Sequence, residues 1–316
     1  MLYKNTFKLM FSNAHLIYKI LLYILLAVAI VGGLSFLVAI PIFNLLVDER
    51  FFLKIGDIYS SFLSNLDLKA LIMEIGILSE KLVDIMNENF SRIVFSAFAS
   101  GFVLFVVGQI ILNLHTLPVS IVVDLYMSSN VKQKITTAFA QSIKKNICYQ
   151  LVTLITLLPI NFGLMYLFLY SLRLFKLGGA FIIVSPFIIV VGFTLLSALK
   201  HTLFCGWIPA MIVKNDGVFK GLKDGMVVPK RRFFQTFANS FALVLTLLFL
   251  NVLGSVFTYG VGLFLTVPVT ILTVNIFGLV AYYSASGQKY YLDAYNVMAP
   301  KTQEYTDKFR DQKYMI

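Results

Sequence analysis

The most distinctive chemistry in the sequence is two groups of basic side chains, one of them followed directly by two aromatic rings. Their members are Lys144, Lys145, Lys230, Arg231, Arg232, Phe233 and Phe234. Basic groups beside an apolar helix attract anionic lipid headgroups by roughly 1 kcal/mol each near a membrane surface. Aromatic rings anchor a helix end at the same depth. We therefore predict that these residues bind lipid, and the alternative is that the cations only mark the inner side of a membrane.

Residues that could support catalysis or bind a metal are scarce. Of the three histidines, His115 and His201 could lie near one membrane interface together with Asp124. A metal site would need these three side chains to converge, and we expect them to remain separate. No metalloprotease, nucleophile-elbow, Walker or dinucleotide-binding motif is present in the sequence. We therefore predict a non-enzymatic protein with no catalytic residue, no metal and no cofactor.

Five amide side chains lie inside long apolar runs. They are Gln109, Asn113, Asn161, Asn251 and Asn275. Polar groups in hydrocarbon must find partners, so these side chains are expected to face the interior of a helical bundle. We favour hydrogen bonds between helices as their role, and a polar pathway for a solute is the alternative. No Asp, Glu or Arg occupies the middle of a run, which argues against ion-coupled or proton-coupled transport.

The apolar runs that contain these amides dominate the composition. Of the 316 residues, 59% are hydrophobic and 13% are charged, and the mean hydropathy is +0.86. Soluble domains carry about 25% charged residues. The sequence therefore predicts an all-α, polytopic membrane helical bundle. Because a membrane helix needs about 20 mostly apolar residues, six spans are expected, at 18–45, 93–119, 148–170, 179–207, 236–258 and 261–286.

The distribution of basic residues predicts the orientation of these spans. With a cytoplasmic N-terminus, 19 of the 26 Lys and Arg residues lie inside and 7 lie outside. Since short cytoplasmic loops carry the excess of Lys and Arg, we expect a cell-membrane protein with both termini cytoplasmic. The interfacial segments are then 120–147 and 208–235, and the cytoplasmic tail is 288–316. Orientation accounts for the net charge of +11, so no nucleic-acid partner is predicted.

Residues 48–92 form the one substantial external segment in this topology. Its apolar residues alternate spacings of three and four, which predicts an amphipathic helix after a shorter helix near 58–66. The residues of this apolar seam are Leu68, Leu71, Ile75, Leu78, Leu82 and Ile85. We favour a helical hairpin that caps the bundle or lies on the membrane surface. A coiled coil that binds a protein partner is the alternative.

Three stretches share a pattern of a short amphipathic segment, a polar break and an apolar span. They begin at Asn5, Ile135 and Gly217. Equivalent points in the three stretches are separated by 132 and 82 residues, and the difference of 50 is close to the 45 residues of the external segment. We therefore predict one membrane domain, 1–316, made of three copies of an interfacial helix plus a two-helix hairpin. The first copy carries the external insertion.

The third copy is the most specific stretch, PAMIVKNDGVFKGLKDGMVVPKRRFFQTFANSF from Pro209 to Phe241. It resembles the membrane domain attached to some bacterial glycerophosphoryl diester phosphodiesterases, and a wider set of six-helix bacterial membrane proteins. The resemblance covers most of the chain and implies a six-helix fold. It rests on a pattern of residue types rather than on a catalytic signature. Because no long soluble segment could hold a phosphodiesterase barrel, the resemblance does not imply that activity.

Together these features favour a scaffold that contacts membrane lipids, or an accessory subunit of a membrane complex. The basic clusters predict that the lipid headgroups are anionic. The main alternative is a transporter or permease component for a small solute or a lipid, and a membrane enzyme comes third. A continuous wet cavity lined by Gln109, Asn113, Asn251 and Asn275 would favour the permease. A dry, packed bundle would favour the scaffold.

Overall fold

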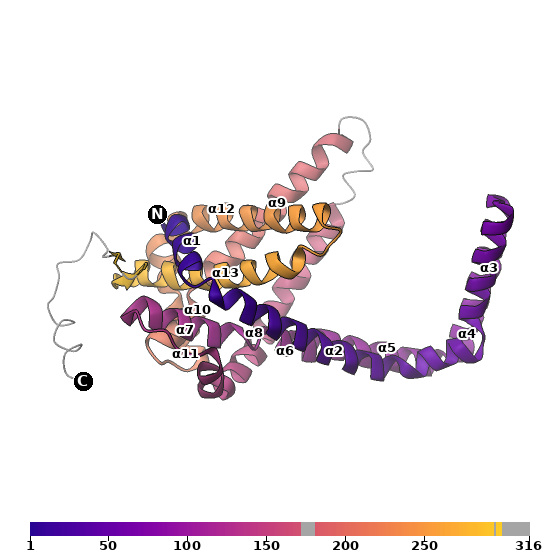
Figure 1. Cartoon of the computed structure of the whole chain (residues 1–316), viewed down its shortest axis with the longest axis horizontal. Coiled ribbons are helices and arrows are strands. Elements are labelled where there is room, and N and C mark those ends of the chain that lie inside the picture. The colour runs from indigo at the N-terminus through magenta and orange to yellow at the C-terminus, as the bar shows by residue number, and fades with distance from the viewer. Residues whose placement is uncertain (172–180, 294, 299–316) are drawn as a thin grey trace. The chain divides into compact units, whose positions relative to one another are not determined.

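The described chain is almost entirely helical, which confirms the predicted all-α class. The computed structural model describes residues 1–171, 181–293 and 295–298 (Figure 1). The helices are α1 (Leu2–Ser12), α2 (His15–Asp48), α3 (Phe51–Asn65), α4 (Leu68–Glu88), α5 (Phe90–Phe102), the π-helix η1 (Val103–Val107), α6 (Gly108–Asn113), α7 (Thr116–Ser129), α8 (Ile135–Ser171), α9 (Phe181–Phe204), α10 (Trp207–Val213), α11 (Val218–Gly225), α12 (Val227–Phe257) and α13 (Leu263–Ser286).

At each of the six predicted spans, the structure contains a helical stretch long enough to cross a membrane. Within the described residues, the stretches long and apolar enough to cross a bilayer are His15–Asp48, Ile93–Ser129, Ile135–Ser171, Val184–Val213, Val227–Phe257 and Leu263–Ser286. Several of them extend beyond the predicted apolar runs, because the flanking amphipathic residues continue the same helix. The chain folds as two compact units, residues 25–112 and residues 1–24 with 113 onward.

The second copy of the predicted repeat differs from the expectation. α8 runs unbroken through Lys144 and Lys145, where the sequence pattern predicts a break. No Gly or Pro lies between Ile135 and Cys148, so nothing in this stretch ends the helix. The first copy is interrupted between α1 and α2, and the third is kinked at Arg232, whose φ of −140° and ψ of 38° are not helical.

The core of the larger unit lies where α1, α7, α10 and α13 pack together (Figure 1). α13 is apolar on nearly every side along its second half, and a helix of that kind must be buried. Its fully buried side chains include Leu272, Ile276, Phe277, Leu279, Val280 and Tyr282. The last described helix, α13, is therefore the centre of this unit.

The antiparallel pair α12 and α13 forms the last predicted hairpin (Figure 1). Its short turn contains Tyr259 and Gly260, with φ of 50° and 90°. The Asn251 side-chain amide donates to Thr270 Oγ1 at 2.9 Å and links the two helices. α9 packs against both α12 and α8. The connection between the predicted spans 148–170 and 179–207 falls mostly on residues 172–180, which lie outside the described residues.

The start of the segment predicted as a cytoplasmic tail, 288–316, is part of the packed fold instead. Strand β1 (Tyr290–Tyr291) pairs antiparallel with β2 (Val297–Met298), with Tyr290 opposite Met298. Tyr290 is buried, and its hydroxyl accepts a hydrogen bond from the Asn5 side chain at 2.8 Å. Lys8 Nζ lies 2.8 Å from Asp293 Oδ2, and this contact holds the pKa of Asp293 well below its usual range. Residues 299–316 lie outside the described part of the chain.

The smaller unit contains the helical insertion predicted at 48–92. The first helix of the insertion, α3, starts earlier than predicted, and α4 matches the predicted seam. The Asp67 carboxylate caps α4 by accepting from the backbone N–H groups of Lys69 and Ala70. On α4, Ile85 is buried, whereas Ile72 is 69% exposed. The end of the predicted seam at Ile85 therefore packs against protein, whereas Ile72 and Ile75 of the same helix are exposed among the described residues.

We predict that a side chain at Gly206 or Gly225 strongly destabilises the protein. These glycines bring the start of α10 against the end of α11, and a Cβ on Gly225 would lie 2.7 Å from the Gly206 carbonyl oxygen. Overpacking of this kind costs about 1–3 kcal/mol or more. Gly225→Ala should lower the thermal unfolding midpoint in detergent. Gly217→Ala is the matched control because open space surrounds Gly217, and equal midpoints for the two variants would contradict the prediction.

Candidate functional site

Two membrane-spanning stretches are interrupted near one end of the larger unit. The chain turns at Leu114 and His115 between α6 and α7, and at Cys205 and Gly206 between α9 and α10. A proline follows each interruption and lies inside the next short helix. The last carbonyl groups of an interrupted helix lose their intrahelical partners, and in a membrane protein other protein groups must satisfy them.

Two amides on α8 satisfy the carbonyl groups at the first interruption. The Asn146 side chain donates to the Leu114 carbonyl oxygen, and Gln150 Nε2 donates to the Asn113 carbonyl oxygen at 2.9 Å. Gln150 also reaches Thr116 Oγ1 at 3.2 Å. Asn146 and Gln150 are four residues apart, so both face the same side of α8, and both are buried. This pair fixes Asn113, Leu114 and the start of α7 against α8.

Three of the predicted lipid-binding cations contact the ends of helices in a similar way. Lys145 Nζ donates to the Met211 carbonyl oxygen of α10 at 2.8 Å. Arg231 donates to the Ala285 carbonyl oxygen of α13 at 3.2 Å, and Arg232 donates to Ser284 Oγ at 3.0 Å. Positive groups stabilise the C-terminal end of a helix because carbonyl dipoles accumulate there. These three side chains therefore hold neighbouring helices together.

The other predicted lipid-binding residues point away from the bundle. Lys144 and Lys230 are exposed, and Phe234 is 83% exposed. Phe233 is half-buried, with its ring 5.4 Å from that of Phe234. An exposed phenylalanine beside an exposed lysine suits the border between hydrocarbon and headgroups. The predicted group thus contains residues that join helices, of which Arg231 is also exposed, and residues that only face outward.

Nearby lysines of the α10–α11 connection are neutralised by carboxylates. Lys214 Nζ lies 2.6 Å from Asp224 Oδ2, and Lys220 Nζ lies 2.7 Å from Asp216 Oδ1. The hydrogen bond to Asp224 raises the pKa of Lys214, and the same bond lowers the pKa of Asp224. Lys144 and Lys230 are thus better placed than Lys214 and Lys220 to attract an anionic headgroup.

The five amides predicted for the bundle interior are distributed over several helices. Asn251 links α12 to α13, as described above. Asn161 is exposed on α8, where its Oδ1 accepts from Lys200 Nζ at 2.7 Å. Asn113 and Asn275 are half-buried in the larger unit, and Gln109 is half-buried in the smaller unit. Their role as the lining of a solute pathway stays a prediction.

The candidate metal ligands each have a different neighbour. The Tyr283 hydroxyl donates to Asp124 Oδ1 at 2.7 Å. His201 Nδ1 lies 3.1 Å from Ser240 Oγ, and the ring of His115 lies 5.4 Å from the ring of Tyr23. In the part of the chain that the structure describes, no three His, Cys, Asp or Glu side chains are close enough to hold a metal ion.

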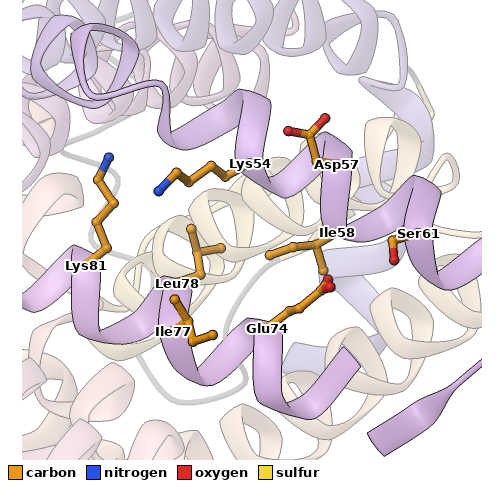
Figure 2. Close-up of a pocket in the computed structure, with 8 residues that line it drawn as sticks. All are labelled: Lys54, Asp57, Ile58, Ser61, Glu74, Ile77, Leu78 and Lys81. Atoms are coloured by element: carbon orange, nitrogen blue, oxygen red, sulfur yellow. The ribbon is translucent and has the colours of Figure 1, made fainter. Parts of the chain in front are cut away.

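Each unit contains a hollow. The first, of about 300 Å³, lies between α3 and α4. Figure 2 shows its lining, in which charged and apolar side chains face each other: Lys54, Asp57, Ile58, Ser61, Glu74, Ile77, Leu78 and Lys81. Lys81 is 3.2 Å from Glu49 Oε2 and closes one end of the hairpin. The second hollow, of about 470 Å³, lies between α8, α9 and α12 and contains Lys200.

The fold and these contacts define the class of the protein. Apolar helices of spanning length, with interruptions whose backbone groups are satisfied by internal side chains, make this chain a multi-pass integral membrane protein. Comparison with protein-family models, curated proteins and solved structures finds no significant match. The resemblance to the phosphodiesterase-associated membrane domain therefore stays a prediction.

Sequence reasoning missed Asn146, Gln150 and Lys200. The first two lie on either side of the predicted start of a span at residue 148, and their spacing of four was the available signal for a shared helix face. Lys200 was counted only as a cytoplasmic charge, although it falls inside the predicted span 179–207. A basic residue within a span was the signal that could have identified it.

We predict that Gln150→Leu destabilises the bundle by about 0.5–1.5 kcal/mol, because it removes a hydrogen bond between α8 and the Asn113 carbonyl oxygen. The Thr116 hydroxyl remains as the second donor to that oxygen. The measurement is the thermal or denaturant unfolding midpoint in detergent. Gln141→Leu makes the same chemical change at an exposed position of the same helix and should have little effect. A Gln150→Leu variant as stable as the Gln141→Leu variant would refute the capping role.

Proposed function

We propose that this protein is a non-enzymatic scaffold or accessory subunit of the cell membrane that contacts anionic lipid at its cytoplasmic side. The observation that carries the proposal is the outward-facing set of Lys144, Lys230 and Phe234. The two exposed cations can pair with anionic headgroups, and the exposed aromatic ring can anchor at the same depth. The neighbouring Arg231 and Arg232 support this set by fixing the kinked start of α12 to the end of α13.

The use of the polar side chains also supports a scaffold over a solute pathway. Asn251 and Gln150 are engaged in hydrogen bonds between helices. Neither of the two hollows is lined by Gln109, Asn113, Asn251 or Asn275. A protein partner of the scaffold would meet the α3–α4 hairpin, where Ile72, Met73 and Ile77 are exposed on α4.

One observation favours the alternative of a permease component for a lipid. The hollow beside Lys200 is apolar, contains a charged group and lies within spanning helices. Reconstitution into vesicles that contain a fluorescent phospholipid separates the two functions. A scaffold leaves the label on its original side, whereas a lipid permease equilibrates it between leaflets.

Removing the two exposed lysines should reduce bound anionic lipid. At roughly 1 kcal/mol for each cation, the double variant Lys144→Gln, Lys230→Gln should lose about 2 kcal/mol, a factor of about 30 in affinity. The measurement is anionic lipid that co-purifies from native membranes, with the loss reduced in high salt because exposed charges are screened. The matched control is Lys54→Gln, Lys69→Gln, two exposed lysines of the α3–α4 hairpin. Equal lipid content in both double variants would overturn the proposed contact.

The proposed orientation places both termini in the cytoplasm. Single cysteines at Ser64 and Ser79, introduced after Cys148→Ala and Cys205→Ala, should react with an impermeant thiol reagent added to intact cells. A cysteine at Thr302 should react only after the cells are opened. Labelling of the Thr302 position in intact cells would contradict the orientation, and the opened cells serve as the control for accessibility.

A further inference from the structure

Lys200 is an ammonium group inside a membrane-spanning stretch. It lies on α9, one turn before that helix ends at Phe204, and its side chain is half-buried. Its Nζ donates to Asn161 Oδ1 on α8 at 2.7 Å. Among the described residues, no carboxylate lies within salt-bridge distance of this Nζ, unlike Lys214 and Lys220 near by in the chain.

The space beside Lys200 is apolar and open at the side. The hollow of about 470 Å³ is formed by one face of α8, one face of α9 and Leu248 of α12. Its apolar lining consists of Leu164, Met165, Phe168, Val190, Phe193 and Leu248. Met165 is 55% exposed and Phe168 is 40% exposed, so the wall on the α8 side reaches the surface of the bundle. In a spanning helix that surface faces lipid.

The polar groups of the hollow gather around the ammonium group. Ser197 is one turn before Lys200 on α9, so the two side chains lie on the same face. Asn161 uses its oxygen for Lys200, and its amide N–H groups remain able to donate to an anion. An isolated charge in hydrocarbon is unfavourable unless it is paired, and the neutral oxygen of Asn161 supplies a dipole but no opposite charge. The group that would pair with the positive charge of Lys200 is therefore an anion.

We propose that this hollow is a binding site for an anionic phospholipid of the surrounding membrane. The headgroup phosphate accepts hydrogen bonds from Lys200, Asn161 and Ser197, and an acyl chain lies along Leu164, Phe168 and Phe193. The occupant enters from the bilayer because the open wall is apolar. A monoanionic phosphodiester balances the single positive charge, whereas a zwitterionic lipid would place its own ammonium group near Lys200.

This inference goes beyond the surface contact proposed above and does not depend on it. Lys144 and Lys230 are unchanged in every variant used to test the Lys200 site. Each proposal can therefore be refuted without refuting the other. Loss of the surface contact would leave one tightly held lipid, and loss of the Lys200 site would leave the weaker, salt-sensitive lipid at the surface.

The test is lipid titration of the delipidated full-length protein, followed by native mass spectrometry of the first bound lipid. Phosphatidylglycerol should bind at least about fivefold more tightly than phosphatidylcholine, the factor expected of one cation near a headgroup. Lys200→Met keeps the length of the side chain and removes the charge, so it should abolish this preference. Asn161→Leu should weaken the preference, and Lys200→Arg should retain it.

The control variant is Lys223→Met, which removes an exposed lysine of α11 and should leave the preference unchanged. Folding is monitored by the unfolding midpoint without lipid, where Lys200→Met is expected to match the original protein or exceed it because an unpaired charge has been removed. The proposal is overturned if the original protein shows no preference, or if Lys200→Met keeps it. It is also overturned if free oleate binds at Lys200 more tightly than phosphatidylglycerol.

Discussion

The backbone of a membrane helix must keep all of its hydrogen bonds, and the larger unit is organised around the places where α-helical bonding stops. At Asn113 and Leu114, two amides of α8 replace the lost donors. At the end of α13, Arg231 supplies a donor to Ala285. Water cannot perform this task in hydrocarbon. The helices that carry the donors are therefore held in a fixed register against the helices that carry the carbonyl groups.

This requirement changes the role of the basic residues near the membrane border. Positive charge there serves topology and attracts anionic lipid, but it also stabilises helix C-termini. Lys144 and Lys145 are adjacent, and helical geometry turns them to different sides of α8, so that one is exposed and the other reaches Met211. A cluster that looks uniform in sequence is therefore divided by the helix into an inner and an outer part.

Lys200 follows the same logic with a different outcome. Its neighbours on α8 and α12 supply one neutral acceptor and an apolar hollow, rather than a helix end or a carboxylate. We proposed that an anionic ligand pairs with this cation, because lipid is the molecule that surrounds a spanning helix. The proposed scaffold function and the proposed lipid site thus share one physical basis, which is the pairing of fixed positive groups with anionic membrane components.

The sequence by itself determined the class, the six spans and the helical insertion, because hydropathy and apolar periodicity are properties of neighbouring residues. It also identified the cations Lys145, Arg231 and Arg232 near helix ends, but it did not identify Asn146, Gln150 or Lys200. Only the tertiary structure decided what each one contacts, since the partners lie far apart in the chain: 66 residues for Lys145 and Met211, 54 for Arg231 and Ala285, and 39 for Lys200 and Asn161. The packing of residues 288–293 against α1 was hidden for the same reason, because Asn5 and Lys8 meet Tyr290 and Asp293 only after the helices assemble. Local patterns specify which segments become helices, whereas the contacts between those helices depend on their register in three dimensions.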